Sequence, residues 1–155
     1  NHSEGLLLLT TNTKVTRLLF QGTVAHTRSY LVQVKNIVTD ETLRKLQSGV
    51  KIEIKGGIPY QTQVCDVSII SKPSWLDSQT HEIPAHLPHT WLLINLTEGK
   101  FHQVRKMVAA VHHKCRRLIR VRIENIELTN WEPGVVIELT ETDFFSKLKI
   151  DNWQA

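Results

Sequence analysis

Hydrophobic and polar residues alternate in several short stretches of the chain, and this pattern is typical of β-strands with one buried face. The run of four leucines at residues 6–9 is continuous instead of alternating, and it predicts a short buried strand over residues 5–10. The other expected strands cover residues 29–34, 50–54, 63–70, 91–97, 118–123, a continuation at 126–128, and 135–139.

Apolar residues recur at helical spacing in four other segments, residues 14–20, 39–49, 101–112 and 141–148. Thr39 and Thr140 stand where N-caps are expected, and Gly49 stands where the second helix would end. Strands and helices are mixed along the chain and tight hairpin turns separate several strands. We therefore expect a single α+β domain over residues 1–155, with a mixed, mostly antiparallel central sheet and helices packed on it.

Positive charge is concentrated in one part of the chain. The net charge is only +4, but eight of the nineteen Lys and Arg residues lie between residues 100 and 122. They follow the start of the expected helix at residues 101–112, and a helix N-terminus beside clustered cations suits a phosphate-rich ligand. This distribution favours a nucleic-acid partner, with RNA ahead of DNA. A solvated basic face explains the charges equally well on their own.

Other features restrict the classes of site and location. Cys65 and Cys115 show no paired spacing, which indicates a reducing, cytoplasmic setting. The longest apolar run, residues 6–9, is too short to cross a membrane, and no signal peptide is visible. The loop expected at residues 71–90 carries three histidines without the tight pairing of zinc ligands, so we expect no metal site. We expect this loop to touch the substrate.

Two side chains are candidates for chemistry. Arg105 lies one turn into its expected helix, where a guanidinium can form a bidentate contact with a carboxylate or a phosphate. Tyr30 lies in an alternating strand beside Arg28. For Arg105, spacing alone is equally consistent with a solvated side chain. For Tyr30, spacing alone favours an aromatic side chain of the core or the sheet surface.

Several motifs that follow one another along the chain give these residues a context. The segment 98–107 (EGKFHQVRKM), the segment 113–123 and the segment around Pro133 to Thr140 resemble the C-terminal half of the RsuA-type pseudouridine synthases. Segments 3–10 (SEGLLLLT) and 28–32 (RSYLV) resemble the earlier motifs of that family. The segments around residues 73–76 and 81–92 are most similar to its RluE-like branch, which modifies large-subunit ribosomal RNA.

The resemblance implies an enzyme that isomerises uridine to pseudouridine without a cofactor, on a pseudouridine synthase-like catalytic domain. It places the essential aspartate immediately before Asn1, outside this sequence, so we expect the chain as given to be inactive and its parent protein to be active. By the same resemblance, Tyr30 stacks on the flipped target base and Arg105 forms an ion pair with the aspartate. Leu118 would line the pocket for the base.

The remaining cations of the basic segment are assigned to phosphate contacts: Lys106, Lys114, Arg116, Arg117, Arg120 and Arg122. The expected partner is ribosomal RNA, and we expect the protein to be a cytoplasmic monomer with no membrane association. The alternative is a non-catalytic RNA-binding module or ribosome-assembly factor that kept the fold. The residue encoded before Asn1 distinguishes the two, because an aspartate there favours the enzyme.

Overall fold

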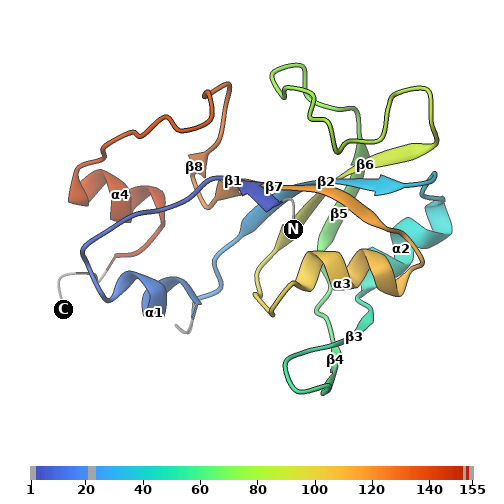
Figure 1. Cartoon of the computed structure of the whole chain (residues 1–155). Helices are drawn as coiled ribbons and strands as arrows, with labels where there is room; N and C mark the ends of the chain where they lie inside the picture. Colours follow the sequence, from blue (N-terminus) through green and yellow to red (C-terminus); the bar gives the residue numbers. More distant parts are fainter. Residues whose placement is uncertain (1–2, 21–23, 152, 154–155) are drawn as a thin grey trace.

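A computed structural model of the chain describes residues 3–20, 24–151 and 153 (Figure 1). The described residues form a six-stranded sheet with the order β1-β7-β2-β6-β5, in which β8 pairs with β7, and a separate two-stranded hairpin of β3 and β4. The strands are β1 Ser3–Gly5, β2 Arg28–Lys35, β3 Lys51–Glu53, β4 Pro59–Gln61, β5 Asp66–Ile70, β6 His89–Leu96, β7 Cys115–Ile123 and β8 Ile126–Glu127. Only β1 pairs in parallel, with β7, and every other pair is antiparallel. The prediction of an α+β fold with a mixed, mostly antiparallel sheet is confirmed.

The helices are α1 Val15–Phe20, α2 Asp40–Ser48, α3 Gln103–Ala110 and α4 Glu141–Lys147. Local capping explains where two of them begin. The Thr39 side chain accepts a hydrogen bond from the amide of Thr42, and the Thr140 side chain accepts one from the amide of Asp143. The expected caps of α2 and α4 are therefore confirmed.

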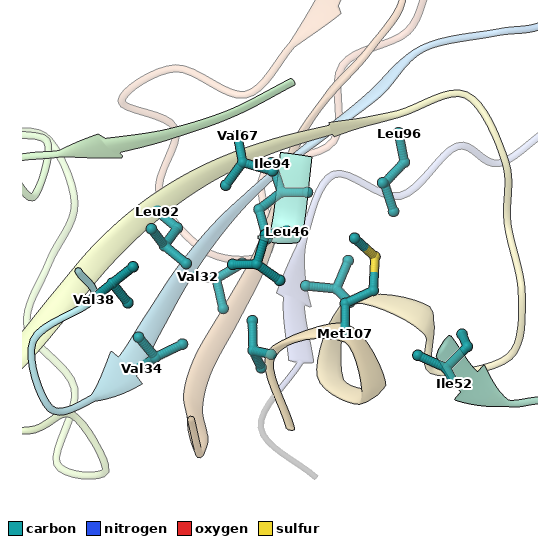
Figure 2. Close-up of a cluster of buried hydrophobic side chains, with 12 residues drawn as sticks. Val32, Val34, Val38, Leu46, Ile52, Val67, Leu92, Ile94, Leu96 and Met107 are labelled. Carbon is teal, nitrogen blue, oxygen red and sulfur yellow. The ribbon is translucent and has the colours of Figure 1, made fainter. Parts of the chain in front are cut away.

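The two faces of the sheet are covered differently. Figure 1 shows α3 and the β3–β4 hairpin on one side and the long β5–β6 loop on the other. Residues at alternate positions of β2, β6 and β5 pack with α2, β3 and α3 in one core cluster, most of which Figure 2 labels: Val32, Val34, Val38, Leu46, Ile52, Val67, Leu92, Ile94, Leu96, Val104, Met107 and Val108. On the other face, Leu31, Trp91 and Ile119 pack against Trp75 and Leu76 of the loop. The strands of the middle of the sheet are thus buried on both sides.

A third cluster joins α1 and α4 to the ends of β7 and β8. Its buried members are Leu6, Val15, Leu19, Ile123, Ile126, Phe145, Leu148 and Ile150. This cluster holds the chain that follows β1 beside the C-terminal helix, and Figure 1 shows these elements together at one end of the sheet.

Two expected strands are not formed. The prediction of a buried strand over residues 5–10 is wrong. Strand pairing with β7 ends at Gly5, and the last backbone hydrogen bond to β7 comes from the Leu6 amide. Beyond it, Leu7 and Leu9 are 69% and 76% exposed. The strand expected at residues 135–139 is also absent, and Val136 is 82% exposed. Both segments have apolar sequences but no neighbouring strand. Strand β7 is longer than expected because it begins at Cys115, and β5 is shorter because it begins at Asp66.

Candidate active site

Tyr30 lies on the face of the sheet that α3 covers. It occupies the same side of β2 as Val32 and Val34, and it packs, half-buried, against the core cluster that contains Met107. Across the strands, Tyr30 pairs with Arg120 of β7 and Val32 pairs with Leu118. Leu118 packs against the same cluster. Tyr30 and Leu118 therefore belong to one surface of the sheet.

Strand β1 enters the sheet beside this surface. Ser3 is in register with Leu118 and Gly5 with Arg120. The approach is close at Gly5, where φ is +112° and an added Cβ would lie 2.3 Å from the Arg120 carbonyl oxygen. The first described residue of the chain is thus held next to Leu118. Asn1 and the position of the expected aspartate before it lie outside the described residues.

Arg105 approaches the same surface from α3. It is half-buried, and its Nη1 lies 3.5 Å from the sulfur of Cys115, the first residue of β7. Cys115 pairs with Val34 of β2 and packs against the shared core cluster. The structure therefore brings Tyr30, Leu118 and Arg105 to one face of the sheet, at the strand that β1 joins.

A further cation borders this face. Arg28, two residues before Tyr30 on β2, is only 4% exposed, and a Cβ at Gly99 would lie 3.1 Å from its Nη1. Burial lowers the pKa of Arg28, and the charge of Arg120 adds to this effect, while Tyr30, Glu124 and Glu98 act in the opposite direction. Sequence reasoning treated Arg28 only as a neighbour of Tyr30. The available signal was its even-numbered position, which places it on the side of β2 that Tyr30 occupies.

Arg117 does not fit the predicted phosphate contact. Its side chain is 2% exposed and lies on the face opposite α3, where it forms ion pairs with Glu4 of β1 and Glu82 of the β5–β6 loop. The contact with Glu4 is bidentate, with Nε–Oε1 and Nη2–Oε2 distances of 2.5 and 3.1 Å. Nη1 also donates to the carbonyl oxygen of Asp77 at 2.6 Å. Arg117 therefore fastens the loop and β1 to β7, and phosphate cannot reach it in this arrangement.

The other predicted phosphate-binding cations are more accessible but several have protein partners. Nε and Nη2 of Arg120 donate to the carbonyl oxygen of Leu6 at 2.9 and 2.7 Å. Arg122 donates to Ser29 Oγ and pairs with Glu127 at 3.5 Å, and both partners of that pair are substantially exposed. Arg116 donates to the carbonyl oxygen of His81 at 3.4 Å, Lys106 donates to that of Glu53 at 2.6 Å, and Lys114 is exposed.

The described residues show neither a metal site nor a membrane-spanning helix. Within residues 3–20, 24–151 and 153, no group of three or more His, Cys, Asp or Glu side chains is placed to hold a metal ion. None of the helices in these ranges is long and apolar enough to cross a lipid bilayer.

Comparisons with known proteins agree on one family. Residues 1–110 match the family model described as RNA pseudouridylate synthase. The ribosomal large subunit pseudouridine synthase E of Vibrio parahaemolyticus is 32% identical over 132 residues, which cover 85% of this chain and 54% of that protein. The protein of the same name from Xanthomonas axonopodis pv. citri is 32% identical over 131 residues, covering 84% of this chain and 67% of that protein.

A solved structure described as a pseudouridylate synthase has the same fold. It superposes with a TM-score of 0.65 at 20% sequence identity and covers 86% of this chain and 49% of that one. The chain spans about half the length of the first curated relatives that it matches, 54% and 55% of the two Vibrio proteins.

Proposed function

The chain belongs to the RNA pseudouridylate synthase family, and from that premise we propose that its parent protein, in which an aspartate precedes Asn1, isomerises a uridine of ribosomal RNA to pseudouridine. The reaction moves the ribose from N1 to C5 of the same uracil ring, so one C–N bond is broken, one C–C bond is formed, and the C5 proton leaves as N1 gains one. The substrate class follows the printed names of the relatives, ribosomal large subunit pseudouridine synthases. Ribosomal RNA as the substrate implies action in the cytoplasm.

The observation that carries this proposal is the placement of three side chains on one face of the sheet. Tyr30 and Leu118 offer an aromatic ring and an apolar surface, which suit a uracil that has left its stack. Arg105 brings a cation to the same face, where it would keep an attacking carboxylate ionised and correctly oriented. We assign that carboxylate to an aspartate encoded immediately before Asn1.

The position of β1 supports this assignment. Ser3 pairs in register with Leu118, so the chain that leads into β1 arrives at the strand carrying the proposed pocket. Arg117 contributes through Glu4, because their bidentate ion pair fixes β1 against β7 from the opposite face. In this proposal Arg117 is a positioning residue, and the phosphate contacts fall to the more accessible cations, which are Lys106, Lys114, Arg116 and Arg122.

The test uses a protein in which the aspartate precedes Asn1. Pseudouridine formation in ribosomal RNA transcripts is measured by mass spectrometry for this protein and for its Arg105→Ala variant. We expect product from the first, and a loss of at least about 100-fold in turnover from the variant, because it removes the charge that positions the nucleophile. Arg44→Ala, which alters an exposed arginine of α2, is the matched control and should retain full activity.

Two results would contradict the proposal. A folded protein that carries the aspartate and gives no product on any ribosomal RNA would refute the enzymatic activity, and RNA binding without product would favour the non-catalytic module. Near-normal turnover of Arg105→Ala would remove Arg105 from the reaction.

A further inference from the structure

An exposed pair of aromatic rings precedes α3 and has no role in the proposed reaction. The Phe101 side chain is 64% exposed, and its ring stacks on that of His102 with centroids 3.9 Å apart and an angle of 19° between the planes. His102 is also exposed. A large aromatic side chain that remains open to solvent while already stacked on one side is a ready surface for another flat ring.

One cation lies at these rings, and the residue that precedes them in the chain is a second cation. Lys106 Nζ lies 5.5 Å from the centroid of Phe101, and Lys100 Nζ lies 4.6 Å from the centroid of Tyr60 on β4. The nearby carboxylate of Glu98 is already engaged by hydrogen bonds from Tyr60 and from Gln103. The charge available to a ligand at the rings is therefore positive, which matches the phosphates that accompany a nucleic-acid base.

The turn that presents the rings is held rigidly. Gln103 is 4% exposed; its Nε2 donates to Glu98 Oε1 at 2.6 Å, and its Oε1 accepts from the Lys100 amide at 2.8 Å. His102 has a φ of 54° and a ψ of 30°, which is the left-handed region of backbone conformation. The hydrogen bonds of the buried glutamine thus hold the turn in a backbone conformation that residues with a Cβ rarely adopt, and the rings are placed before any ligand arrives.

The turn also adjoins the candidate active site. Gly99 lies against the guanidinium of Arg28, two residues before Tyr30, and the His102 carbonyl accepts the amide of Lys106, next to Arg105. A strand of RNA that delivers one base to Tyr30 would pass close to these rings.

We propose that Phe101, stacked on His102 and flanked by Lys100 and Lys106, is a stacking platform for an unpaired RNA base that neighbours the target uridine. The inference rests on the proposed function in taking RNA as the ligand. It adds a subsite that selects single-stranded over duplex RNA, because only an unpaired base exposes a face to the ring.

The test measures binding and does not require catalysis. The affinity of the chain for a fluorescein-labelled single-stranded oligouridine, and for a blunt duplex of that strand with oligoadenosine, is measured by fluorescence anisotropy. Phe101→Ala should weaken binding of the single strand by about 5- to 150-fold, the range that one base–aromatic stack supplies. Binding of the duplex should change by less than about twofold, since paired bases do not reach the ring.

Two further variants make the outcome specific. Phe101→Trp keeps an aromatic face and should restore most of the affinity, which a merely structural role for Phe101 would not predict. Val136→Ala removes another exposed apolar side chain and should bind both RNAs as the wild type does. Thermal unfolding of each variant verifies that the fold is intact.

The results that overturn the platform are distinct from those that overturn the enzyme. Unchanged single-strand affinity in Phe101→Ala, equal losses for single strand and duplex, or no rescue by tryptophan would each refute it, even if pseudouridine is formed. Selective loss of single-strand binding with rescue supports the platform, even if no product appears.

Discussion

Replacing Arg117 with methionine tests the most deeply buried charge in the described structure. Methionine keeps much of the aliphatic volume of the side chain and removes the guanidinium. The variant leaves Glu82, whose side chain is 9% exposed, without one of its two cations, and it leaves Glu4 without its bidentate partner. The β5–β6 loop and β1 lose their common attachment to β7 at the same time.

The size of the effect follows from the exposure of the two carboxylates. Removing one partner of a buried ion pair costs about 3–5 kcal/mol, because the remaining charge is desolvated and uncompensated. Here Glu82 keeps Lys72 Nζ at 2.9 Å and Glu4 is 37% exposed and can rehydrate. We therefore expect a loss of about 3 kcal/mol in the free energy of unfolding, and at about 2–4 °C per kcal/mol this lowers Tm by roughly 6–12 °C.

The assay is urea unfolding followed by circular dichroism at neutral pH. Arg122→Met on the same strand is the matched control: its ion pair with Glu127 is exposed on both sides, with side chains 41% and 56% accessible, so the change should cost less than about 1 kcal/mol. The double variant with Arg117→Met and Glu82→Gln should be more stable than the sum of the single changes indicates, because glutamine leaves no buried charge unpaired. A cost below 1 kcal/mol for Arg117→Met, or strict additivity in the double variant, would refute the reasoning.

Two further predictions concern titrating groups. Burial raises the pKa of the Cys65 thiol to about 11 and also raises the pKa of Cys115. Both thiols should therefore react with a disulfide reagent at pH 8 much more slowly in the folded protein than in the unfolded chain. Equal reaction rates in the two states would contradict this prediction. Burial tends to raise the pKa of Glu124, but hydrogen bonds from Lys149 and the Thr27 amide and the charges of Lys149 and His26 hold it below its ordinary value. The stability that Glu124 supplies is present above pH 4.5 and is lost as the pH falls through its lowered pKa. In Glu124→Gln, the free energy of unfolding should therefore fall less steeply with decreasing pH below pH 4.5. An unchanged slope of unfolding free energy against pH would exclude this role for Glu124.

The elements that sequence reasoning located correctly depend on local chemistry. The N-caps at Thr39 and Thr140 are one-residue signals whose hydrogen bonds close within three residues. The alternation in β2 and β6 marks a side chain on each face, and both faces are buried. The failures at residues 6–10 and 135–139 have a common cause, because an apolar segment becomes a strand only when another strand lies beside it. Which segments lie beside each other as strands is determined by the whole fold and not by the local sequence.

In the candidate site, too, the sequence identified some features correctly and could not identify others. Tyr30, Arg105 and Leu118 could be collected from motifs, and the structure places them on one face. Arg117 could not be separated from Arg116 by composition or spacing, although the Arg117 side chain is buried in ion pairs with Glu4 and Glu82 while that of Arg116 stays partly exposed. The register of β7 against β2 shifts between Gln33 and Val34, so the side that a residue takes cannot be counted from the sequence.

The cations of the basic segment at residues 100–122 have two different roles, because some of them stabilise the fold and others remain available to a ligand. Arg117 neutralises the carboxylates of Glu4 and Glu82 on one face of the sheet. The guanidinium of Arg120 donates two hydrogen bonds to the carbonyl oxygen of Leu6. Lys100 and Lys106 stand at the exposed rings before α3, and Arg105 stands at the face that contains Tyr30. In the proposed complex with RNA only accessible cations can release counterions, so fewer phosphates are neutralised than the eight cations that the sequence places in this segment would suggest. A proposed RNA-binding surface with few phosphate contacts must gain more of its affinity from bases, and the proposed stacking of an unpaired base on Phe101 and His102 would supply that contribution.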